Sequence, residues 1–125
     1  MKRSLYLFIC DIVENIELIE NSINNIAKEK FESNKDSIDA TIRRIEVIGE
    51  AVKNLPGSFR EKHSNIPWKD IAGMRDVTIH GYFRVDLDTI WKVIKKDFPD
   101  LKGKILIIKQ ELEKEESKKK SDNEN

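Results

Sequence analysis

The feature that most constrains the fold is a run of aliphatic residues near the start of the chain, spaced alternately four and three positions apart. Such spacing is the a/d pattern of a helix that buries one stripe against other helices, sustained here for about three heptads. It predicts a long amphipathic helix over residues 3–29. The apolar positions of that helix are Leu5, Ile9, Ile12, Ile16, Ile19, Ile23 and Ile26.

A second run with the same spacing follows a polar stretch. Asn34 and Asp36 are suitable N-cap residues before it, and Pro56 with Gly57 forms a strong stop signal after it. Two helices that each carry one apolar stripe bury both stripes by packing antiparallel. The apolar positions of this second helix are Ile38, Ile42, Ile45, Ile48 or Gly49, Val52 and Leu55.

The middle of the chain predicts a loop and then a short helix. Residues 56–67 are expected to form a surface loop that includes a short helical turn. Pro67 suits the first position of a helix that continues through about residue 77. Gly73 lies inside that helix, where glycine costs about 1 kcal/mol relative to alanine. A packing or close-approach constraint is therefore expected around Gly73.

Two more helices are predicted after residue 85. Asp86 or Asp88 caps the first, and Pro99 opens the last, which covers about residues 100–113. The buried face of the first consists of Ile90, Trp91, Ile94 and Phe98. The chain is therefore predicted to be all-α, an antiparallel bundle of four to five helices. The bundle domain is expected to span 1–113, followed by a disordered charged tail over 114–125, which has no apolar residue.

Composition limits the partners and the compartment. Lys plus Arg and Asp plus Glu both number 23, so the net charge is zero and any attraction to RNA must be local. The single cysteine, Cys10, cannot form an intramolecular disulfide and is expected to pack beside the apolar seam. The apolar stretch 5–10 is too short for a membrane span and lacks a signal-peptide cleavage site. We therefore expect a cytoplasmic protein with no membrane partner.

The stretch RDVTIHGYF, residues 75–83, concentrates the groups that could do chemistry. Arg75 and His80 are five residues apart, about 140° around an ideal helix, so their side chains diverge unless the helix is irregular or a second copy takes part. Asp76 is one turn from His80, where a carboxylate can orient the imidazole and raise its pKa. The plain alternative is a solvated helix surface followed by core aromatics at Tyr82 and Phe83.

Other chemistries find little support in the residues. The histidines His63 and His80 are 17 positions apart with no nearby cysteine, which fits no common metal-ligand spacing. His63 is expected to be a surface residue of the loop. The PGSF stretch lacks the Lys-Ser/Thr of a phosphate-binding loop, and no serine or cysteine has a visible base partner. The sequence thus indicates neither a metal nor a cofactor.

Two longer stretches, together with the first helix, resemble a known family. They are DATIRRIEVIGEAVKNLP at 39–56 and IPWKDIAGMRDVTIHGYFRVDLDTIW at 66–91. The sequence is similar to the HepT-like ribonucleases of the HEPN superfamily, the toxin halves of HepT/MntA toxin–antitoxin pairs. The resemblance covers about residues 1–112, and its most specific element is Arg-x4-His-x-Tyr, here Arg75, His80 and Tyr82.

This resemblance implies a function and assigns residues by position. Members of this kind are helical bundles that dimerise and cleave RNA without a metal, in a cleft at the dimer interface. Arg75 and His80 would then be catalytic. Tyr82 would be the residue to which a partner nucleotidyltransferase antitoxin transfers AMP to silence the nuclease. The alternative is a non-catalytic helical partner or nucleotide-binding scaffold of a nucleotidyltransferase.

The chemistry of the residues fits the nuclease hypothesis. Cleavage of RNA without a metal needs a base, an acid and a positive charge near the phosphate, which imidazole and guanidinium groups supply. Asp76 is the expected orienting residue for His80, from the spacing alone. A basic rim for RNA is expected from Arg43, Arg44, Lys69 and Arg84, with Arg60 and Lys62 as further contributors.

Overall fold

The computed structural model describes the backbone of residues 4–80 and 86–123 and the side chains of residues 4–74 and 86–119. The described residues form helices joined by short connections and contain no strand, so the predicted all-α class is confirmed. The elements are α1 (Leu5–Ile23), α2 (Lys28–Glu32), α3 (Lys35–Lys53), α4 (Gly57–Lys62), α5 (Trp68–His80), α6 (Leu87–Lys92), a π-helical turn (Val93–Asp97) and α7 (Phe98–Asn123).

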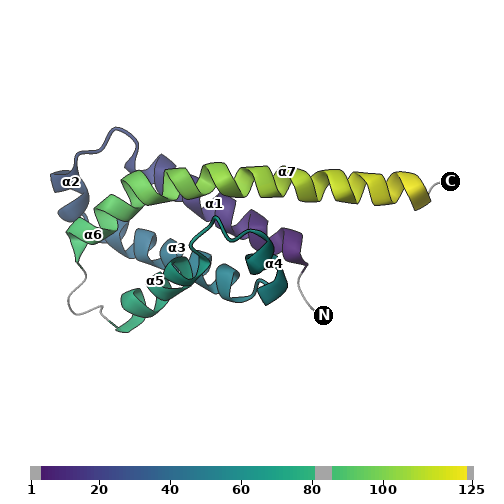
Figure 1. Cartoon of the computed structure of the whole chain (residues 1–125). Helices are drawn as coiled ribbons and strands as arrows, with labels where there is room; N and C mark the ends of the chain where they lie inside the picture. Colours follow the sequence, from purple (N-terminus) through teal and green to yellow (C-terminus); the bar gives the residue numbers. More distant parts are fainter. Residues whose placement is uncertain (1–3, 81–85, 124–125) are drawn as a thin grey trace.

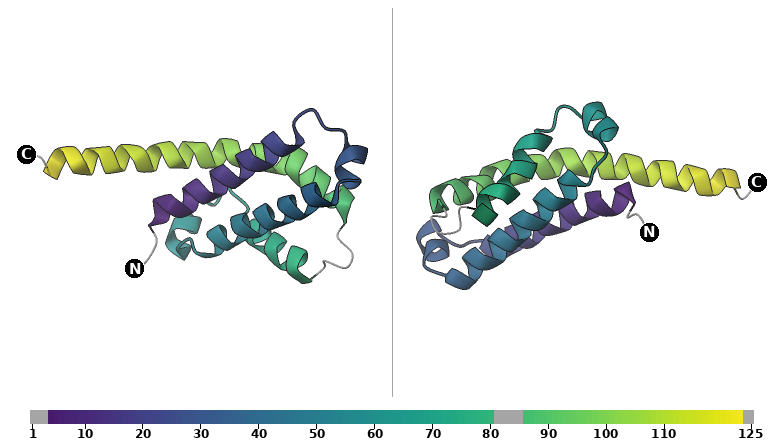
Figure 2. Two further views of the ribbon diagram at one scale, coloured as in Figure 1. Left: turned by 180° about the vertical axis from the view of Figure 1, so that it is seen from behind. Right: turned by 90° about the horizontal axis from the view of Figure 1, so that it is seen from below.

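The longer helices pack side by side as a bundle (Figure 1). Helix α3 lies against both α1 and α5, and α7 lies along α1. Neighbours run in opposite directions, as Figure 2 shows from two further sides. Helices α2 and α4 are short and lie at opposite ends of the bundle.

Both predicted apolar seams form the core. In α1 the side chains of Ile9, Ile12, Ile16 and Ile19 have no exposed surface, and Ile23 is 3% exposed. The α3 seam and the buried face predicted for the helix after residue 85 are confirmed as well, with partial burial at some positions. Their buried members are Ile45, Ile48, Val52, Leu55, Ile90, Ile94 and Phe98, while Ile38, Ile42 and Trp91 are half-buried against the core.

The first helix ends earlier than the sequence pattern predicts. The predicted helix over 3–29 was wrong beyond Ile23, because Asn24 is extended and Asn25 has a φ of 61°. Asparagine tolerates this left-handed conformation better than most residues, and its side chain competes with helical hydrogen bonds. The chain then turns into α2, whose Phe31 is buried with its ring centroid 5.3 Å from that of Trp91.

The last two predicted helices are joined rather than separate. Pro99 has no N–H and its ring crowds the carbonyl of residue 95, which normally stops a helix. A π-helical turn at Val93–Asp97 widens the backbone there, and the Phe98 N–H donates to the Val93 carbonyl five residues back. The helix therefore continues past Pro99 instead of breaking before it.

Helix α7 extends beyond the bundle as a single helix (Figure 1). Residues 114–123, expected to be disordered, continue this helix, and residues 114–119 are all exposed. Glutamate and lysine are good helix formers, which accounts for a helical backbone without apolar contacts. The boundary of the packed domain at residue 113 stays a prediction. Within residues 4–80 and 86–123, no helix has the length and apolar character needed to cross a bilayer.

Candidate functional site

Helix α5 carries the candidate catalytic positions, and its first turns are firmly anchored. Trp68 and Ile71 are buried, and α5 packs against α3. The Trp68 indole N–H donates to the His63 carbonyl at 3.0 Å, which ties the helix to the loop before it. Pro67 directly precedes the helix, and Asp70 places a carboxylate in its first turn, where the helix dipole favours a negative charge.

The backbone of α5 remains helical through both candidate catalytic positions. Arg75 and His80 therefore stand about 140° apart around the axis and about 7.5 Å apart along it. Asp76 occupies the position one turn before His80, as the sequence predicts. The side chains of residues 75–80 lie outside the described residues, so the pairing of Arg75 with His80 and of Asp76 with His80 stays a prediction.

Gly73 does not have the close neighbour that the sequence predicts. A Cβ atom built at this position meets no described atom within 4 Å, so the expected packing or close-approach constraint is not found among the described residues. The position is half-buried, yet the space beside its backbone is open.

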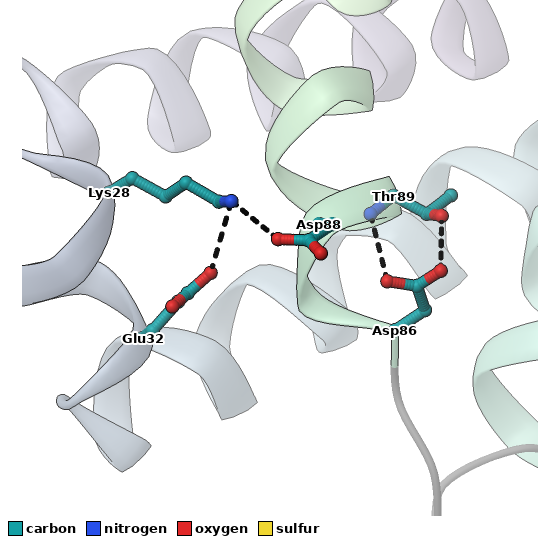
Figure 3. Close-up of polar contacts among 5 residues, drawn as sticks. All are labelled: Lys28, Glu32, Asp86, Asp88 and Thr89. Carbon is teal, nitrogen blue, oxygen red and sulfur yellow. Dashed lines mark hydrogen bonds and ion pairs between the residues drawn. The ribbon is translucent and has the colours of Figure 1, made fainter.

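Tyr82 and Arg84 fall within residues 81–85, which lie outside the described residues. The next described residue, Asp86, caps α6 and accepts from the Thr89 N–H at 3.2 Å and the Thr89 hydroxyl at 2.6 Å (Figure 3). These bonds hold the pKa of the Asp86 carboxyl below its usual value. The cap confirms Asp86, one of the two predicted cap residues. It sets the start of α6 directly after the segment that carries Tyr82.

Lys28 of α2 forms a second contact with the first turn of α6. Lys28 forms an ion pair with Asp88 in the first turn of α6, and it also lies 3.6 Å from Glu32 (Figure 3). Hydrogen bonding to Asp88 is the main cause that raises the pKa of Lys28. Sequence analysis missed this contact because its partners are 60 residues apart and no local pattern connects them.

The described residues of the predicted basic rim differ in availability. Arg43 is 76% exposed and lies 3.7 Å from Glu46, one turn along α3. Arg44 is half-buried, and its guanidinium donates to the Leu18 carbonyl at 3.3 Å, which ties α3 to α1. Lys69 is exposed in the first turn of α5. Lys69 and Arg43 are thus better placed than Arg44 to meet a ligand.

His63 and Cys10 have structural surroundings. The His63 ring is half-buried, with its centroid 4.7 Å from that of Phe59, so it is less exposed than the sequence suggests. Cys10 is half-buried on α1, in agreement with the expectation that it packs beside the seam.

Comparison with known proteins shows which family the chain belongs to. A sequence profile for the family described as Ribonuclease HepT-like matches residues 12–108. The match covers well over half of the chain and contains α3, α5 and α6. The protein therefore belongs to the HepT-like ribonuclease family, as its motif predicts.

Curated relatives carry related names. A Methanocaldococcus jannaschii protein, named as a gamma-glutamylcyclotransferase and candidate RNase, is 49% identical over 119 residues, or 95% of this chain and 54% of that relative. The chain thus spans about half the length of that relative. The "Probable ribonuclease HepT" of Thermococcus cleftensis is 49% identical over 104 residues, or 83% of this chain and 94% of the relative. No solved structure gives a significant match.

Proposed function

We propose that this chain is a metal-independent endoribonuclease, the toxin of a toxin–antitoxin pair, which acts as a homodimer in the cytoplasm. The observation that carries the proposal is the helical backbone of α5, which separates Arg75 from His80 by about 140° within one chain. A two-fold dimer juxtaposes equal surfaces, so a guanidinium of one copy can meet the imidazole of the other. Membership of the HepT-like ribonuclease family supports RNA as the substrate.

The proposed reaction uses the 2′-hydroxyl of the RNA as its nucleophile. The imidazole of His80 takes the 2′-hydroxyl proton while the 2′-oxygen forms a bond to phosphorus. The bond from phosphorus to the 5′-oxygen breaks, and that oxygen receives a proton from a water molecule. The products are a 2′,3′-cyclic phosphate and a 5′-hydroxyl. Arg75 stabilises the negative charge that develops on the phosphate oxygens, and Asp76 orients His80.

The catalytic assignment is tested with purified protein and RNA in the presence of EDTA. Wild type is expected to cleave, and His80→Ala and Arg75→Ala are each expected to lose cleavage by at least about a hundredfold. Lys30→Ala on α2 is the control, because Lys30 is exposed at the end of the bundle opposite α4. Equal cleavage by all four proteins would reject both residues as catalytic, and no cleavage by any of them would favour the scaffold alternative.

Mixing the two inactive variants tests whether the site is shared between subunits. In a heterodimer of Arg75→Ala with His80→Ala, one site keeps an intact arginine from one copy and an intact histidine from the other. Random mixing followed by exchange should restore about a quarter of wild-type activity, because half of the dimers are mixed and each has one intact site. Absence of any recovery, with mixed dimers demonstrated by mass spectrometry, would contradict the shared site.

We further propose that a nucleotidyltransferase antitoxin silences the nuclease by transferring AMP from ATP to the Tyr82 hydroxyl, with release of pyrophosphate. An AMP ester two residues from His80 adds bulk and negative charge beside the catalytic positions, which would exclude RNA. The chain has two tyrosines, so Tyr6→Phe is a matched control for Tyr82→Phe. After incubation with ATP and the antitoxin, wild type and Tyr6→Phe should gain one AMP and Tyr82→Phe none. AMP on the Tyr82→Phe protein would reject the site.

A further inference from the structure

A shallow cleft of about 510 Å³ lies where α4, the following loop and the first turn of α5 meet. We call it the α4–α5 cleft; its charged and polar lining residues are Arg60, Glu61, Ser64, Lys69 and Asp70. Its volume falls in the range of sites that hold small ligands. All of its described lining residues precede residue 75, where the segment to which the proposed reaction is assigned begins.

Two cations of the cleft are available to a ligand. The Nε atom of Arg60 is buried and has no hydrogen-bond partner within the part of the chain that the structure describes. A guanidinium N–H that gives up water without a partner is unfavourable. A small movement of the Arg60 side chain into the cleft would let a bound phosphate accept from this N–H. Lys69 is exposed at the rim of the same cleft.

The carboxylates in the cleft argue against a simple anion as the ligand. Glu61 and Asp70 balance the charges of Arg60 and Lys69, so the lining is close to neutral. A nucleotide suits such a lining, because its phosphate takes the cations while its ribose hydroxyls and base amino groups donate to carboxylates. Ser64 can donate or accept in either part.

The position of Lys69 on α5 connects the cleft with the candidate catalytic histidine. Lys69, Gly73, Asp76 and His80 fall within about 60° of one another around the helix axis, so they share one stripe. Lys69 precedes His80 by 11 residues, or about 16.5 Å along the helix. The open space beside Gly73 leaves the middle of this stripe uncovered by the described part of the chain. At about 3.4 Å per stacked nucleotide, that length corresponds to about five nucleotides.

We propose that the α4–α5 cleft is a nucleotide subsite for the RNA substrate, within about five nucleotides of the scissile phosphate. Arg60 and Lys69 bind a backbone phosphate there, and Asp70 and Glu61 accept hydrogen bonds from the base and ribose of the same nucleotide. The inference rests on the proposed endoribonuclease function. It adds a contact that selects the RNA rather than one that cleaves it.

Binding of single-stranded RNA tests the cations of the cleft. The assay uses the full chain with His80→Ala, so that RNA stays intact, and a labelled oligonucleotide of random sequence. Adding Arg60→Ala or Lys69→Ala should weaken binding roughly threefold to tenfold and reduce the slope of log K against log salt by about 0.7 each. Lys30→Ala, an exposed lysine at the far end of the bundle, should change neither. Because Lys69 is exposed, Lys69→Ala tests the cleft even where Arg60→Ala perturbs folding.

Cleavage-site mapping tests the carboxylates. On a randomised RNA, Asp70→Asn should change the base preference at one position within about five nucleotides of the cut, since an amide donates where a carboxylate only accepts. Lys69→Ala should leave that base preference unchanged and raise KM more than it lowers kcat.

The outcomes separate this inference from the proposed function. A wild type that cleaves RNA, together with unchanged affinity, salt slope and base preference in all three cleft variants, would overturn the subsite and leave the nuclease standing. A wild type that cleaves no RNA would reject the nuclease, while the salt slopes would still decide whether the cleft binds RNA. Cleft variants that lose antitoxin binding but keep RNA binding would also overturn the subsite, because the cleft would then serve a protein partner.

Discussion

The hydroxyl of Tyr6 donates a 2.9 Å hydrogen bond to Glu113 Oε1, which ties the first turns of α1 to α7 across 107 positions of sequence. The negative charge of Glu113 favours the protonated phenol. This hydrogen bond is the main cause that raises the pKa of Tyr6 above its ordinary value of 10.0, and a side-chain hydrogen bond with Cys10 adds to it.

The raised pKa of Tyr6 predicts a loss of stability at alkaline pH. The unfolded chain releases the phenolic proton near pH 10.0, while the folded chain still holds it. Stability that is fully present below that pH is therefore lost as the pH rises toward the folded pKa. Urea unfolding at pH 8 and pH 11 should show a smaller alkaline loss for Tyr6→Phe than for wild type. Identical losses in the two proteins would contradict this linkage.

The seam of α1 predicts a sharp contrast between two neighbouring positions. Ile16 has no exposed surface, so Ile16→Ala should destabilise the fold by about 2 to 5 kcal/mol through lost burial and a cavity. Leu18, two residues on, is 41% exposed, so Leu18→Ala should change the free energy of unfolding by less than about 1 kcal/mol. Chemical denaturation of both variants measures the difference. Comparable losses would mean that Leu18 is covered in the protein in solution.

The sequence predicts these core positions because apolar residues at a and d positions form one face of a helix, and burial of that face is the favourable arrangement. The same reasoning named Asn34 and Asp36 as candidate caps of α3, and the Asn34 side chain accepts from the Ser37 N–H at 3.1 Å. It also named Asp86 as a candidate cap. These features are local, since spacing and capping depend on residues within one or two turns.

The features that the sequence did not predict depend on competition between local rules. Ile26 continues the seam of α1, but the two asparagines before it end the helix, so periodicity alone misplaced the boundary. Pro99 signals a break, but a π-helical turn accommodates it. The Lys28–Asp88 contact and the α4–α5 cleft arise from tertiary packing, which spacing within one segment does not encode. Arg75 and His80 stood out in the sequence as groups that could do chemistry, but their assignment as catalytic residues rests on the resemblance of their motif to that of a family.

The cap on α6 predicts a local effect beside the segment that carries Tyr82. Asp86→Ala removes the acceptor for the Thr89 N–H, so that amide should exchange with solvent faster. Asp86→Asn keeps an acceptor and should exchange more slowly than Asp86→Ala. Asp88→Ala is the matched control, because it removes the contact with Lys28 and leaves the cap in place. Hydrogen exchange followed by mass spectrometry resolves the three variants, and equal rates would contradict a role for the cap.

The hydrogen bonds of the Asp86 cap also predict a loss of folding stability at low pH. The pKa of the Asp86 carboxyl is lowered in the folded state, chiefly by hydrogen bonds from the Thr89 side chain and backbone. Its contribution is therefore present above the unfolded value of 3.8 and is lost as the pH falls through the folded pKa. Wild type should lose more stability than Asp86→Asn between pH 5 and pH 2. A larger loss in Asp86→Asn would contradict the assignment.

The open space beside Gly73 predicts that alanine is tolerated there. Glycine inside a helix costs about 1 kcal/mol relative to alanine, and a Cβ at Gly73 meets no atom of the described residues within 4 Å. Gly73→Ala should therefore raise the free energy of unfolding by about 0.5 to 1 kcal/mol. Gly103 in α7 has the same open surroundings, so Gly103→Ala is a matched control with the same expected gain. Loss of stability or assembly in Gly73→Ala alone would mean that a group from outside the described chain occupies this space. Because Gly73 shares a stripe with His80, a second subunit would then be the first candidate for that group. Sedimentation of the two variants would show whether Gly73→Ala alone changes the oligomeric state.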